Sequence, residues 1–73
     1  MRYFFSCEGA QHFDDADGTE LDGDHSAMVQ AIQNAGEILT DHAQAFSVTP
    51  FWRMTVSDET GRVAFRLNFT IDQ

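Results

Sequence analysis

Apolar and polar residues alternate in the last third of the chain. Residues 51–57 place Trp52, Met54 and Val56 at every second position, and residues 62–71 continue the same alternation. The apolar positions of this second segment are Val63, Phe65, Leu67, Phe69 and Ile71. A period of two predicts two half-buried strands. Residues 58–61, Asp-Glu-Thr-Gly, predict a hairpin loop between them in which Gly61 has a positive φ.

The first third predicts two further strands and a loop. Residues 2–7, Arg-Tyr-Phe-Phe-Ser-Cys, are rich in aromatic side chains and predict a strand inside the sheet. Residues 8–10 predict a turn, and residues 11–13 predict a short second strand. Residues 14–24 contain five Asp and two Gly, with Leu21 as the one sizeable apolar side chain, so they predict a loop with tight turns.

Residues 25 to about 45 predict an amphipathic helix, because apolar residues recur there at steps of three and four. We expect the following side chains to face the sheet: Met28, Ala31, Ile32, Ala35, Ile38, Leu39, Ala43 and Phe46. Asp24 is predicted to be the N-cap, and residues 47–50, which end in Pro50, are predicted to break the helix. Gly36 costs about 1 kcal/mol relative to Ala unless a close backbone contact requires it.

The order β-β-α-β-β predicts an α+β fold in which one helix packs on one face of an antiparallel sheet. A chain of 73 residues is expected to form one domain spanning residues 1–73.

The net charge of −8 changes which partners we expect. It is the wrong sign for a phosphate backbone or an anionic membrane, so neither direct nucleic-acid binding nor membrane binding is expected. It favours encounter with a basic partner. Nine aromatic residues are a heavy load for so short a chain, and a second copy could cover some of them. We therefore expect a protein partner or self-association as a homodimer.

Cysteine content predicts the compartment and argues against thiol chemistry. Cys7 has no second cysteine to pair with, so we expect a cytoplasmic protein. The aromatic run in the opening residues 1–7 is too short for the apolar region of a signal peptide, so no targeting segment is expected. A cysteine in an aromatic strand is most simply a small buried hydrophobe. With no glycine-framed nucleophile and no phosphate loop, we expect no catalytic residues, no cofactor and no enzyme activity.

Residues 15–18, Asp-Ala-Asp-Gly, resemble part of a calcium loop, but the register fails. Position one of the loop would be Phe13, which has no side-chain oxygen, and position twelve would be Asp24 instead of a bidentate Glu. The three histidines lack the spacing of zinc-ligand pairs, so no metal site is expected. Arg53, Arg62 and Arg66 are expected to form salt bridges to the acidic loop instead of a surface on which bases stack.

Three segments of the chain resemble those of a family of short bacterial proteins with a domain of unknown function. They are residues 2–5 (Arg-Tyr-Phe-Phe), residues 15–21 (Asp-Ala-Asp-Gly-Thr-Glu-Leu) and residues 52–62, from Trp52 to Arg62. The resemblance implies no catalytic residue, because the family offers none. The β-β-α order with an Asp- and Gly-bearing link is also similar to the nuclease-like domain of HicB-type antitoxins, at the level of fold alone.

These observations predict a non-catalytic protein-interaction or regulatory module with an acidic surface. The side chains predicted to bind the partner are Asp15, Asp17 and Glu20. The alternative is a protein that binds a small ligand or a cation through residues 14–24.

Overall fold

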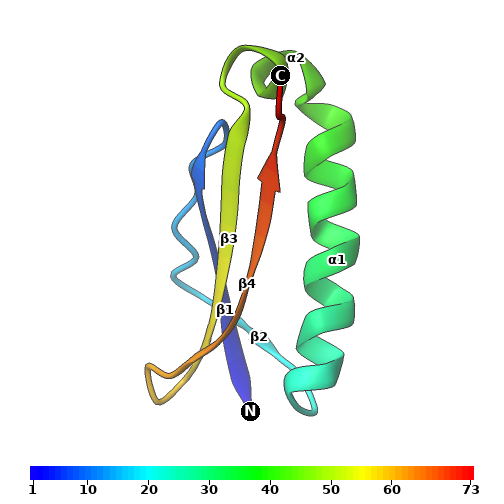
Figure 1. Cartoon of the computed structure of the whole chain (residues 1–73). Helices are drawn as coiled ribbons and strands as arrows, with labels where there is room; N and C mark the ends of the chain where they lie inside the picture. Colours follow the sequence, from blue (N-terminus) through cyan, green and yellow to red (C-terminus); the bar gives the residue numbers. More distant parts are fainter.

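Four strands form one antiparallel sheet in the order β2-β1-β3-β4, with β1 and β3 at its centre. The computed structural model describes residues 1–73 (Figure 1). The elements along the chain are β1 Arg2–Gly9, β2 Thr19–Glu20, α1 Asp24–Asp41, α2 Ala43–Val48, β3 Phe51–Asp58 and β4 Val63–Thr70. The α+β class with one antiparallel sheet is therefore confirmed.

In β3 and β4 the predicted alternation places one apolar row beneath the helix, and β1 adds a similar row. Tyr3, Phe5 and Cys7 of β1 are buried, as are Trp52, Met54 and Val56 of β3. Phe65, Leu67 and Phe69 of β4 pair directly with the buried β3 residues and are half-buried. The opposite face of the sheet carries no helix (Figure 1), and its side chains are mainly polar, with Phe4 and Phe51 as exceptions.

Helix α1 reaches the sheet through its smallest side chains. Ala27 and Ala31 are fully buried, because a methyl group lets the helix backbone approach the strands closely. The short α2 covers the far end of the sheet with Phe46, whose ring packs edge-on against Trp52 and Phe69 at centroid distances of 5.9 and 5.3 Å. The electrostatics of aromatic rings favours edge-on contacts of this kind. The core therefore has a helical cover along its length and an aromatic cluster at one end.

The predicted helix is divided in two. The chain leaves α1 at Asp41 and passes through His42, with φ −121° and ψ 28°, before α2 begins at Ala43. The prediction of a single helix to about residue 45 was therefore wrong. Apolar periodicity runs unbroken through His42 and gives no sign of the break. After the break, Phe46 of α2 lies against the end of the sheet and is buried.

Two details of α1 also differ from prediction. Asp24 is the first helical residue and Gly23 occupies the N-cap position, because the Asp24 carboxylate binds Tyr3 and Arg62 instead of the first-turn amides. Met28 and Ile32 are 41% and 58% exposed, although they were expected to face the sheet. The buried stripe is rotated toward Ala27 and Ala31, because small side chains give the closest approach.

The second strand also lies later in the chain than predicted. Residues 11–13 contribute only an isolated bridge between Phe13 and Cys7, whereas β2 forms at Thr19–Glu20 opposite Tyr3 and Arg2. Gly61 has the predicted positive φ, at 89°. A side chain at Gly36 would meet open space, so no close contact requires a glycine there.

Candidate functional site

The acidic segment, residues 14–24, begins alongside β1 and is held there by Asp15. The Asp15 carboxylate accepts hydrogen bonds from the backbone N–H groups of Phe5, Asp17 and Gly18 at 3.0, 3.2 and 3.0 Å. Partial burial alone would raise the pKa of Asp15, but these donors hold it below the ordinary value. Asp15 therefore positions the segment, and its oxygens are already engaged.

Both sides of Asp15 are fixed to β1. Phe13 and Cys7 exchange backbone hydrogen bonds of 2.8 and 3.1 Å. Arg2 donates from Nη1 to the carbonyl oxygen of Asp17 at 3.1 Å. Gly18, with φ 72°, passes so close to β1 that a Cβ atom would lie 2.9 Å from the Tyr3 carbonyl oxygen. The positive φ and the close approach together explain the glycine at this position.

The remaining carboxylates of the segment point to solvent. Asp14 is 82% exposed and lies 3.3 Å from Nε2 of His12. Asp17 and Asp22 are exposed, and their carboxylates make no hydrogen bond or ion pair within the chain. Glu20 is exposed and pairs with the amino group of Met1, with Arg2 at 4.0 Å. Of the three predicted binding residues, Asp17 is therefore free, Glu20 is partly engaged and Asp15 is turned inward.

A shallow hollow of about 210 Å³ lies beside the acidic segment on the open face of the sheet. Its lining residues are Ser6, Cys7, Glu8, His12, Asp14 and Thr55. Asp14 and His12 are therefore exposed to solvent and also line this hollow. Sequence reasoning placed Asp14 in the acidic loop but not among the predicted binding residues, and no local signal distinguishes it from Asp15.

The Cys7 thiol and the possible metal ligands of the chain are also candidate reactive groups. Burial raises the pKa of the Cys7 thiol to about 11, so the nucleophilic thiolate is scarce at neutral pH. The predicted burial of Cys7 is confirmed. No group of three or more His, Cys, Asp or Glu side chains is arranged to hold a metal ion. None of the helices combines the length and apolar character needed to cross a bilayer.

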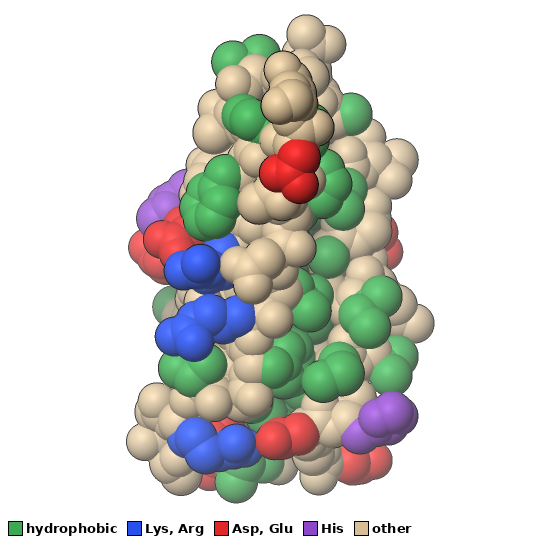
Figure 2. Space-filling view, in the orientation of Figure 1, with side chains coloured by type: hydrophobic (Ala, Val, Ile, Leu, Met, Phe, Trp, Pro, Cys, Tyr) green, Lys and Arg blue, Asp and Glu red, His purple; other side chains and the backbone are tan.

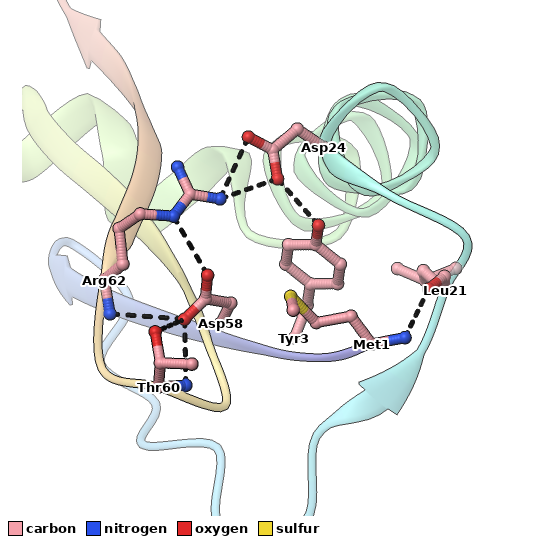
Figure 3. Close-up of polar contacts among 7 residues, drawn as sticks. All are labelled: Met1, Tyr3, Leu21, Asp24, Asp58, Thr60 and Arg62. Atoms are coloured by element: carbon pink, nitrogen blue, oxygen red, sulfur yellow. Dashed lines mark hydrogen bonds and ion pairs between the residues drawn. The ribbon is translucent and has the colours of Figure 1, made fainter.

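A second polar cluster lies at the end of the sheet where the β3–β4 hairpin meets the start of α1 (Figure 3). Asp24 accepts from the Tyr3 hydroxyl at 2.6 Å and from Nη2 of Arg62 at 2.9 and 3.1 Å. Nε of Arg62 also donates to Asp58 at 3.0 Å. The hydrogen bond to Asp24 raises the pKa of Tyr3 to about 12. Every side chain of the cluster bonds to another member, so the cluster is a structural brace.

The three arginines that were expected to pair with the acidic loop have different surroundings. Arg62 pairs with Asp24, as expected for a salt bridge to the acidic segment. Arg53 instead lies 3.7 Å from Glu8 of the neighbouring strand and donates to Asn68 at 2.8 Å. Arg66 forms no ion pair, contrary to the prediction. Figure 2 shows two of the basic side chains together at one side of the sheet, close to acidic ones.

Comparison with known proteins gives a family and no activity. No curated protein and no solved structure matches the chain. The similarity to HicB-type antitoxin domains therefore gains no support. A family model described as a domain of unknown function, DUF6894, matches residues 2–70, and the chain belongs to this family.

Proposed function

We propose that the domain is a non-catalytic protein-interaction module whose acidic segment binds a basic segment of a partner protein. The observation that carries the proposal is the division of labour among neighbouring carboxylates. Asp15 turns inward and fixes the backbone through three N–H groups, whereas Asp14 and Asp17 on either side turn outward. A fixed backbone presents these charges at little entropic cost on binding.

Charge supports the same proposal. The chain has twelve acidic and four basic side chains, and Asp17 and Asp22 have no cationic partner within the molecule. Carboxylates that are neither paired nor buried retain their full attraction for a lysine or arginine from outside. Such an interaction gains mainly in association rate and weakens as salt screens it.

The test compares two variants of equal net charge. Asp14→Asn/Asp17→Asn removes the outward carboxylates, and Asp41→Asn/Asp72→Asn removes two exposed acids elsewhere. Immobilised wild-type protein and both variants are exposed to lysate of the source cell at 50 and 300 mM salt, and bound proteins are identified by mass spectrometry.

We expect a basic protein that wild type and the Asp41/Asp72 variant retain at low salt and that the Asp14/Asp17 variant loses. If both double variants retain the same proteins as wild type, the acidic segment is not the binding surface and the proposal is wrong. Asp15→Asn is unsuitable as a binding test, because it would release the backbone of the segment.

A further inference from the structure

The free edge of β4 is the longest unpaired strand edge of the molecule. β4 pairs with β3 on one side and with nothing on the other, along all of Val63–Thr70. The opposite edge of the sheet is short and covered, because β2 has two residues and Phe13 bridges to Cys7. Long edges are usually protected by charges, proline or a bulge. Arg66 is the one charged residue of β4, and the irregularity in its pairing with β3 lies at its start, where the register shifts between Val56 and Ser57.

An apolar flank of α1 lies beside this edge. Asn34 and Glu37 line a hollow together with Phe5 and Phe13, so their flank of the helix faces β1. At 100° per residue, Met28 and Ile32 lie on the other flank, toward β4. Figure 2 shows hydrophobic side chains gathered along the boundary between β4 and α1. This boundary is the β4–α1 face. It consists of Met28, Ile32, Ala35, Leu39, Phe65, Leu67 and Phe69.

The sequence of β4 is complementary to itself. Residues 65–69 read Phe-Arg-Leu-Asn-Phe, so the apolar pattern is symmetric about Leu67. In a two-fold antiparallel pair with Leu67 opposite its own copy, Phe65 lies opposite Phe69 of the second chain. Arg66 then lies opposite Asn68. All three apolar residues remain on the helix side of the sheet in both chains.

Other registers between β4 and its copy are less favourable than the one with Leu67 opposite Leu67. A shift by one residue would put the two helices on opposite faces of the joint sheet. A shift by two in one direction places Arg66 opposite Arg66 of the second chain, and like charges directly opposite are destabilising. The equivalent shift in the other direction shortens the pairing within β4 from residues 64–70 to residues 66–70.

We propose that two copies of this chain pair through their β4 edges, with Leu67 opposite Leu67, to form a two-fold dimer with one eight-stranded sheet. The flanks of the two α1 helices approach each other over the joint and cover Met28 and Ile32. The β4–α1 face contains no acidic residue, so the dimer keeps the carboxylates of both copies at its periphery. Asp14 and Asp17 of the acidic segment are separated from β4 by β1 and β3, and the dimer does not use them.

Dimerisation and partner capture respond to salt in opposite directions. Two chains of net charge −8 repel one another, and salt screens this repulsion. The dimer is therefore expected to tighten with salt, whereas capture by the acidic segment weakens. Either proposal can fail while the other stands.

The test begins with light scattering of the eluting peak and sedimentation at 50 and 500 mM salt. We expect twice the chain mass of 8.2 kDa, and at least a tenfold lower dimer dissociation constant at the higher salt. Ile32→Glu and Asn68→Lys each alter an exposed side chain of the joint and should raise the dissociation constant at least tenfold. Val48→Glu, at a more exposed apolar position outside the joint, is the control and should leave it unchanged.

Engineered cysteines test the register. Leu67→Cys should form an intermolecular disulfide under mild oxidation, since directly opposite residues lie within disulfide reach. Arg66→Cys should not, because its copy lies two positions away along the strand. Wild type contains only the buried Cys7 and serves as the uncrosslinked control. A monomer at both salt concentrations, a dimer indifferent to Ile32→Glu and Asn68→Lys, or crosslinking at position 66 but not 67 would overturn the proposal.

Discussion

Arg62 and Asp24 join elements that lie 38 positions apart in the chain. Nη2 of Arg62 lies 2.9 and 3.1 Å from the two carboxylate oxygens of Asp24, so one guanidinium nitrogen ties the β3–β4 hairpin to the start of α1. The same arginine binds Asp58 at the base of the hairpin. This contact takes Asp24 away from the helix amides and explains why the predicted N-cap interaction is absent.

Asp58→Asn is expected to lower the melting temperature more than Asp24→Asn. Asp58 is 4% exposed and accepts hydrogen bonds from Thr60 and Arg62, whereas half of the Asp24 side chain is exposed to water. Removing the charge of a buried carboxylate weakens the hydrogen bonds that it accepts and is costly, whereas an exposed ion pair contributes little. Thermal unfolding followed by circular dichroism measures both. Equal melting temperatures for the two variants would contradict the ranking.

Stability should fall in acid through Asp58. Its hydrogen bond from the Thr60 hydroxyl is the largest contribution that lowers the Asp58 pKa from 3.8 to about 2. The unfolded chain binds a proton at higher pH than the folded one, so acid favours unfolding. The contribution is complete above the ordinary pKa and is lost as the pH falls to about 2.

The matched variant for this pH dependence is Thr60→Val, which removes the hydroxyl and keeps the side-chain volume. Urea unfolding at intervals between pH 5 and pH 2 should give a shallower decline for the variant than for wild type. An unchanged slope would show that other carboxylates, such as Asp24 and Asp15, whose pKa values are also lowered, dominate acid unfolding.

Local pattern predicted β1, β3 and β4 well, and β2 and the loop before it poorly. Alternation placed Trp52, Met54 and Val56 on the buried face, because a strand repeats every two residues whatever it pairs with. The position of β2 depends instead on where Asp15 and Gly18 meet β1, which are contacts between distant residues. Apolar periodicity likewise did not reveal the break at His42, because it depends on the packing of Phe46 against Trp52.

The same limit applies to the candidate site. Composition identified the acidic segment, but which carboxylate turns inward depends on the amides of Phe5 and Gly18, so Asp15, Asp17 and Glu20 could not be told apart. One local signal was available for the structural brace. An Asp that is followed by Thr and Gly at a hairpin is typical of a side chain that caps the turn, and Asp58 does this.

Two glycine substitutions are expected to have opposite effects. Gly36→Ala adds a methyl group in open space within α1 and should raise the free energy of unfolding by about 1 kcal/mol, since Ala favours the helix. Gly61→Ala also meets open space, but at φ 89° it should lower the free energy of unfolding by about 1–2 kcal/mol. Urea unfolding measures both. A stabilising Gly61→Ala would mean that the hairpin relaxes out of the left-handed conformation.

Phe46→Ala should be the most damaging of these substitutions, because Phe46 alone anchors α2. Its ring is 3% exposed and touches both Trp52 and Phe69. Removal of such a ring costs about 3–5 kcal/mol, which is much of the total stability that a domain of this size can have. Trp52 is the one tryptophan, so its fluorescence reports directly on this contact.

We expect red-shifted emission and a fall in the urea midpoint for Phe46→Ala, with a smaller fall for Phe46→Leu, which keeps most of the apolar volume. The control is Val48→Ala on the exposed side of α2, which should change neither quantity measurably. Because Phe46 links α2 to the end of the sheet and α1 contacts the sheet separately, a partial loss of helix signal at low urea would show that α2 detaches before the sheet unfolds. Wild-type stability in Phe46→Ala would contradict the assignment of α2 as part of the core.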